Sequence, residues 1–228
     1  MSDGAVLLAT LQLADAALPI GRFVHSHGLE AWLAAHPGAT DDALAELVEA
    51  TVCEGVAPLD GAVVAHAHRC TALAPLLALD RRLTARKLTP AARAASLSCG
   101  RRLAALAPRL APGDPLVADL CARVRARGAD GNLAVVAGTL ARALGVPARD
   151  AVLVELRGAA SALLSAAVRL DALAPTRAQV ILAGAAPALA VAAGRALTVG
   201  LDRLSSTAPE LELFALAHAR AGARLFAT

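Results

Sequence analysis

Apolar side chains recur at helical spacing along most of the chain. The segment 148–171 shows this pattern best, because its apolar positions follow one another at intervals of three or four residues and form one continuous stripe. The members of this stripe are Val152, Leu156, Ala160, Leu163, Ala167 and Leu170. No segment shows a convincing alternating pattern of the kind that predicts β-strands. The pattern therefore predicts an all-α protein.

Residues that start and stop helices divide the chain further. Thr89-Pro90 and Asp114-Pro115 each place an N-cap residue before a proline at the first helical position, and Gly145 followed by Pro147 predicts a helix end. Other predicted starts are Thr40, Asn132, Asp150 or a neighbour, and Thr176. These signals predict one domain over residues 1–228, a single compact bundle of about nine or ten helices. We expect the ends, 1–17 and 218–228, to be flexible and to order when a partner binds.

The high apolar content, 57% of 228 residues, raises the question of a membrane protein. The longest stretch without Asp, Glu, Lys or Arg holds 17 residues, between Arg177 and Arg195, and includes Pro187. A spanning helix needs about 20 strongly apolar residues, so this stretch predicts a buried helix. No basic residue precedes Arg22, which argues against a signal or transit peptide. We expect a cytoplasmic protein without membrane contact.

Charge is distributed unevenly along the chain. Residues 1–60 contain nine acidic residues and a single basic one, Arg22, whereas residues 81–109 contain eight basic residues and no acidic one. Two solvated faces would explain this distribution. Docking surfaces that steer charged protein partners would explain it equally well.

Catalytic signatures are scarce. The four cysteines are widely spaced, and the histidine pairs His25/His27 and His66/His68 are each two residues apart, which is not the spacing of a helical metal site. A helical enzyme using His25, His27 or His66 stays as one alternative. Another is a helical transcription regulator with a ligand-binding body, but the acidic residues 1–60 and the scarcity of aromatic residues disfavour contact with nucleic acid.

The stretch 18–32, LPIGRFVHSHGLEAW, differs in composition from the Ala- and Leu-rich remainder. Pro19 fixes the backbone and Gly21 permits a tight turn, after which Phe23 is expected to fill an apolar pocket. Ser26 is a predicted N-cap for the helix that contains Leu29 and Trp32. We interpret this stretch either as a structural turn or as a turn that meets a neighbouring protein through His25 and Glu30.

Read from Leu11, the segment LQLADAALPIGRFVHSHGLEAW resembles the N-terminal signature of the urease accessory protein F family. Residues 79–103, residues 161–179 and the final RLFAT (224–228) resemble later segments of the same family, in the same order. Arg22 stands where many members have a small residue, and His218 is followed by alanine where the family has glutamate.

The resemblance implies a non-enzymatic helical protein that dimerises and binds the urease accessory protein H or D. That complex would recruit the nickel-carrying GTPase G and deliver nickel to apo-urease; no cofactor, metal ligand or catalytic residue is expected in this chain. The residues expected to meet partners are Arg22, His25, Glu30, Arg101, Arg102, His218, Arg220, Arg224, Leu225 and Phe226. Those expected to shape the first motif are Pro19, Gly21, Phe23, Ser26, Gly28 and Leu29.

Overall fold

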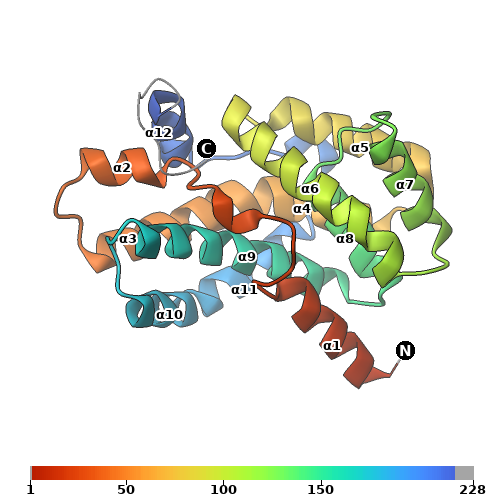
Figure 1. Cartoon of the computed structure of the whole chain (residues 1–228), viewed down its shortest axis with the longest axis horizontal. Helices are drawn as coiled ribbons and strands as arrows, with labels where there is room; N and C mark the ends of the chain where they lie inside the picture. Colours follow the sequence, from red (N-terminus) through yellow and green to blue (C-terminus); the bar gives the residue numbers. More distant parts are fainter. Residues whose placement is uncertain (1, 219–228) are drawn as a thin grey trace.

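A computed structural model describes residues 2–218, and this part of the chain consists of helices and connecting turns without a β-strand. It holds more α-helices than the nine or ten expected (Figure 1). The elements are α1 (Asp3–Ala14), η1 (Arg22–Val24), α2 (Leu29–Ala35), α3 (Asp41–Ala50), η2 (Thr51–Gly61), α4 (Ala62–Arg69), α5 (Leu73–Arg86), α6 (Pro90–Leu110), α7 (Pro115–Arg125), α8 (Leu133–Ala143), α9 (Ala148–Arg169), α10 (Pro175–Gly184), α11 (Ala186–Ala196), η3 (Leu201–Arg203) and α12 (Glu210–His218).

The helix α9 is the centre of the bundle. It packs against α4, α8, α10, α11 and the π-helix η2, and its predicted apolar stripe faces inward, with Val152, Leu156 and Ala160 all nearly inaccessible to solvent. By length and composition α9 could cross a membrane, but 56% of its most apolar window is buried within the bundle. That burial is what a core helix of a folded domain shows.

Three predicted helix starts are confirmed by their hydrogen bonds. The side chain of each N-cap accepts a hydrogen bond from the backbone N–H three positions later. The distances are 3.2 Å for Thr40 and Ala43, 3.0 Å for Thr89 and Ala92, and 2.9 Å for Asp114 and Val117. Such bonds satisfy donors that have no partner within the helix. The predicted stop is also present, since α8 ends at Ala143 and Gly145 adopts a positive φ of 68°. The starts predicted near Asp150 and Thr176 lie at Ala148 and Pro175, because a proline begins or precedes each helix.

The uncharged stretch between Arg177 and Arg195 is not the single buried helix expected. It forms α10 and α11, which meet at an angle of 50° around Ala185. Gly184 and Pro187 flank this bend, and a proline there has no N–H to continue the α10 ladder. Val180 and Val191 are 57% and 64% exposed, so both helices lie at the surface.

Residues 41–69 form one continuous rod in which α3, η2 and α4 follow without a break. Pro58 lies inside the π-helix η2 and cannot donate a backbone hydrogen bond. In the same helix, the carbonyl of Glu54 accepts hydrogen bonds from the backbone N–H and the hydroxyl of Thr207, at 3.0 and 2.9 Å. This pair of bonds fixes the segment before α12 to the middle of the rod.

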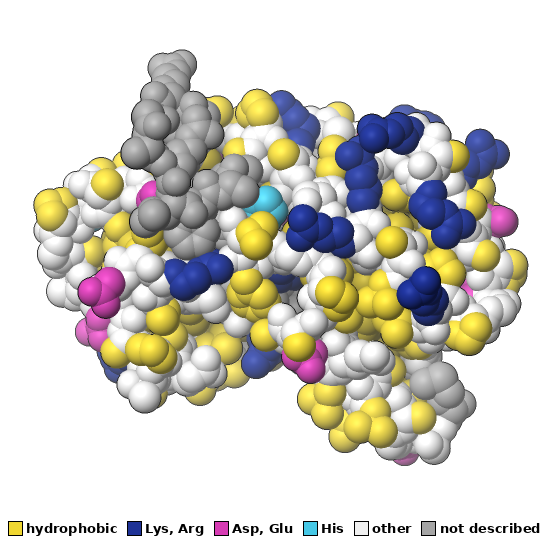
Figure 2. All heavy atoms as spheres, viewed as in Figure 1, with side chains coloured by type: hydrophobic (Ala, Val, Ile, Leu, Met, Phe, Trp, Pro, Cys, Tyr) yellow, Lys and Arg dark blue, Asp and Glu magenta, His cyan; other side chains and the backbone are white. Residues whose placement is uncertain are grey.

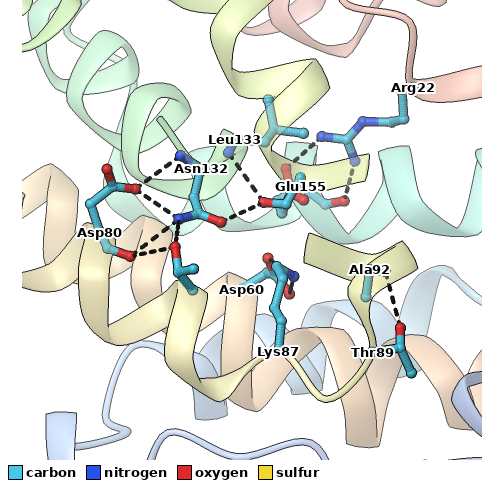
Figure 3. Close-up of polar contacts among 11 residues, drawn as sticks. Arg22, Asp60, Asp80, Lys87, Thr89, Ala92, Asn132, Leu133 and Glu155 are labelled. Atoms are coloured by element: carbon cyan, nitrogen blue, oxygen red, sulfur yellow. Dashed lines mark hydrogen bonds and ion pairs between the residues drawn. The ribbon is translucent and has the colours of Figure 1, made fainter. Parts of the chain in front are cut away.

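A buried polar network joins α5, α6 and α8. The Asp80 carboxylate, 1% exposed, accepts from the N–H groups of Gly131 and Asn132 and from the Asn132 side-chain amide, at 2.8 to 2.9 Å (Figure 3). The Ser96 hydroxyl donates to the side-chain oxygen Oδ1 of Asn132 at 3.0 Å. Because every partner is buried and satisfied, the network specifies how these three helices meet.

Candidate partner-binding site

The motif at 18–28 folds into a compact turn. Gly21 and Gly28 adopt φ values of 76° and 92°, and His27 between them has φ 53°. The predicted N-cap at Ser26 is wrong by two residues: α2 begins after Gly28, and the Leu29 N–H donates to the Ser26 carbonyl at 3.0 Å. Gly28 is required here, because a Cβ at this position would overlap the Leu211 carbonyl of α12.

The apolar anchors of this turn differ from the one expected. Ile20 and Leu29 enter the hydrophobic core, at 6% and 0% exposed, while Phe23 is only half-buried and Pro19 is exposed. Phe23 therefore does not fill a core pocket. Phe23 lies in the short 3₁₀ turn η1, between the two residues that enter the core.

Arg22 points inward and holds the turn on α9. Its Nη2 donates to the Glu155 carboxylate at 2.6 Å and its Nη1 to the Glu155 backbone carbonyl at 3.1 Å (Figure 3). The guanidinium lies directly over Gly158, which has no side chain to obstruct it. Burial alone would lower the pKa of Arg22, but the Glu155 carboxylate raises that pKa above its ordinary value. The residue expected at a partner surface thus serves an internal ion pair.

A cavity of about 150 Å³ lies beside this ion pair, between η2, α6, α9 and α12. A second ion pair faces it: Lys87 Nζ donates to both oxygens of Asp60 at 2.8 and 2.9 Å. Glu212 on α12 also lines the cavity, and burial raises its pKa although Lys87 opposes the shift. The thiol of Cys99 is buried, which raises its pKa and leaves it protonated at neutral pH.

The helix α12 covers the turn and one side of the cavity. Leu211 is buried, and the Trp32 indole N–H donates to the Glu210 carboxylate at 2.7 Å. His36 stacks on Trp32 with ring centroids 4.4 Å apart and meets Phe214 edge-on at 5.7 Å. These contacts connect α2 and α12 across 178 residues of sequence, so the first motif and the beginning of the tail lie side by side (Figure 1).

The two histidines of the motif are both held in environments that disfavour the charged ring. Burial lowers the pKa of His25, and Arg102 lowers it further. Burial also lowers the pKa of His27 to about 4, with further lowering by His25, Lys87 and Arg22 against the opposite effect of Asp60. Both rings are therefore neutral at physiological pH.

This shift makes the stability of the protein depend on pH. Unfolded His27 binds a proton below about pH 6.5 and folded His27 only below about pH 4, so its contribution is complete above pH 6.5 and is lost as the pH falls toward 4. Between pH 7 and 4.5, we expect His27 to account for about 2 kcal/mol of the fall in unfolding free energy. The lowered pKa of His25 also reduces the free energy of unfolding as the pH falls, whereas the raised pKa of Glu212 increases it.

Urea unfolding of the wild type and of His27→Asn at pH 7, 6, 5 and 4.5 would measure this effect. Asparagine suits the position because it tolerates positive φ. The variant should lose about 2 kcal/mol less than the wild type over this range. Parallel pH profiles of the two proteins would show that His27 titrates at its ordinary pKa in the fold.

The remaining predicted site residues fall into three groups. Arg101 and Arg102 are exposed on α6, and the Arg102 guanidinium lies against Gly21. Glu30 lies half-buried in the first turn of α2. His218 is the last residue of α12, and the predictions for Arg220, Arg224, Leu225 and Phe226 fall outside the described residues. Glu155, Lys87, Asp60 and Glu210 could not be predicted from the sequence, since their partners are distant in the chain.

No group of three or more His, Cys, Asp or Glu side chains within residues 2–218 is arranged to hold a metal ion. His66, a candidate in the enzyme alternative, contacts the Val199 carbonyl through its Nε2 at 2.8 Å. The polar side chains around the cavity are engaged mainly with one another, which stabilises the turn and α12.

Comparison with known proteins gives a consistent result. Residues 39–186 match the family model UreF. The chain is 30% identical over 221 residues to the urease accessory protein UreF of Corynebacterium efficiens, covering 96% of this chain and 95% of that protein. It is 32% identical over 227 residues to the UreF of Kocuria rhizophila, covering 97% of each. It is 30% identical over 223 residues to UreF 2 of Brucella abortus, covering 96% of this chain and 91% of that protein.

Proposed function

Because this chain belongs to the UreF family of urease accessory proteins, we propose that it is a cytoplasmic, non-catalytic assembly factor for urease. In this proposal it forms a homodimer and binds the H/D accessory protein. The complex recruits the GTPase G and allows nickel to be inserted into apo-urease. The family assignment argues against the transcription-regulator alternative.

One structural observation carries the proposal. The helix α12 covers the 18–28 turn and precedes residues 219–228 in the sequence, so the first motif lies against the helix that leads to the tail. A partner that binds the tail would therefore also lie near the turn, whose Gly21 contacts the exposed Arg102 of α6. We infer a composite docking surface made of this turn, α12 and the tail.

Co-purification tests the proposal directly. Full-length protein mixed with the H/D accessory protein should elute with it from a size-exclusion column, and the GTPase G should join the peak only when both are present. The G protein with this chain alone is the matched control. Separate elution of this chain and the H/D protein at micromolar concentrations of each would rule out the proposed assembly.

A further inference from the structure

Four exposed arginines surround one turn at the end of the molecule opposite α3. Arg123 and Arg125 lie in the last turn of α7, and Arg127 follows with a φ of 57°. Arg101 reaches the same turn from α6, where its Nε donates to the Asp130 carbonyl at 3.3 Å and its side chain lies beside Gly131. We call Arg101, Arg123, Arg125 and Arg127 the arginine cluster. On the face shown in Figure 2, most Lys and Arg side chains lie over the half formed by α5, α6 and α7.

Several acidic residues of the first sixty positions form ion pairs in the fold, whereas the arginine cluster forms none with the described residues. Acidic residues from the first sixty positions find partners far along the chain: Asp41 and Asp42 pair with Arg177 at 3.1 and 2.9 Å, and Glu54 pairs with Arg195 at 2.8 Å. Among the described residues, no acidic side chain forms an ion pair with the arginine cluster. The nearby Asp130 carboxylate accepts instead from the Thr84 hydroxyl at 2.7 Å. The cluster therefore places four exposed arginines at one end of the fold, none of them in an ion pair with another described residue.

We propose that the arginine cluster docks a carboxylate-rich surface of a partner protein. The planar guanidinium group can donate two parallel hydrogen bonds to one carboxylate, and the four exposed groups on α6, α7 and the turn after α7 carry a local excess of positive charge that fits an acidic partner surface. Residues 90–131 contain no aromatic side chain on which bases could stack, which favours a protein over a single-stranded nucleic acid. The inference concerns a surface separate from the turn and tail of the proposed function.

Fluorescence anisotropy with three labelled probes tests this inference: a deca-glutamate peptide, a deca-glutamine peptide and a 20-nucleotide single-stranded DNA. The variant Arg123→Gln/Arg125→Gln/Arg127→Asn removes three charges, with asparagine at the position of positive φ. The control Arg149→Gln/Arg157→Gln/Arg203→Gln removes three charges from exposed arginines on α9 and η3. At low salt the cluster variant should bind deca-glutamate about tenfold more weakly than the wild type, and the control less than twofold more weakly.

Equal losses in the two triple variants would overturn the proposal, because net charge alone would then explain binding. Tighter binding of the DNA than of deca-glutamate, lost in the cluster variant, would also overturn it in favour of a phosphate-binding surface. If the cluster variant melts at a lower temperature than the wild type, the single variant Arg125→Gln replaces it in the binding assay. Its affinity for deca-glutamate should fall about twofold. Co-purification of each variant with the H/D protein tests the proposed function independently of peptide binding by the arginine cluster.

Discussion

A chain that ends at Ala219 should fail to form a complex with the H/D accessory protein while keeping nearly the same thermal midpoint as the full-length protein. The deleted residues include Arg224, Leu225 and Phe226, a composition typical of an interface anchor. Burying Phe226 in a partner contributes about 2 kcal/mol, more than tenfold in affinity, and the loss of the whole anchor exceeds that. Calorimetric titration with the H/D protein and a thermal melt of each chain would measure both quantities.

Deletion of Ala227 and Thr228 alone is the matched control, because it shortens the tail and leaves the Arg-Leu-Phe sequence intact. This control should bind the H/D protein as the full chain does. A large fall in the melting temperature of the longer deletion would make Phe226 a core residue and the tail structural. Normal binding by the longer deletion would show that this protein does not use its tail, in agreement with its departure from the family at Ala219.

The substitution Glu155→Leu should lower the free energy of unfolding by about 3 to 5 kcal/mol, because it leaves the guanidinium of Arg22 buried without its counter-ion. The two side chains are only 14% and 8% exposed, so water cannot readily replace the lost partner. For a chain of this length the thermal midpoint should fall by about 10 °C. Urea unfolding followed by circular dichroism would give the free energy.

The double variant Arg22→Met/Glu155→Leu removes both charges and replaces them with apolar side chains. It should recover most of the stability, since a buried ion pair can often be replaced by apolar packing at little cost. If the double variant is as unstable as Glu155→Leu, the guanidinium contributes through its packing over Gly158 and its bond to the Glu155 carbonyl. If the single variant loses less than 1 kcal/mol, the pair is solvated and does not hold the turn.

Local features of the fold could be predicted from the sequence. The N-caps at Thr40, Thr89 and Asp114 are confirmed because each depends on residues no more than three positions away. The helix α9 was predicted because its stripe spans many turns. The bend between α10 and α11 was missed, although Gly184 and Pro187 could have signalled it.

Features of the site that depend on distant residues could not be predicted in the same way. Ser26 was a reasonable N-cap by residue type, but the close approach of α12 requires glycine at 28, and the helix begins there. Arg22 was expected at a partner surface, and its internal ion pair could not be predicted because the counter-ion, Glu155, lies 133 positions away. The charge asymmetry was visible in the sequence, whereas the ion pairs that Asp41, Asp42, Glu54 and Asp60 form with distant basic residues were not.

The contacts between the two ends of the chain also constrain when they can form during synthesis. The partners of Arg22 and Trp32 are Glu155 and Glu210, so the ribosome must release about two thirds of the chain before the first contact forms and nearly all of it before the second. The network of Asp80, Ser96 and Asn132 is complete once residue 132 is released, before Glu155 and Glu210. The nascent protein can therefore assemble α5 to α8 first, while the 18–28 turn is still without its final partners. During that interval the earliest part of the chain to emerge is the part most open to chaperones and to aggregation.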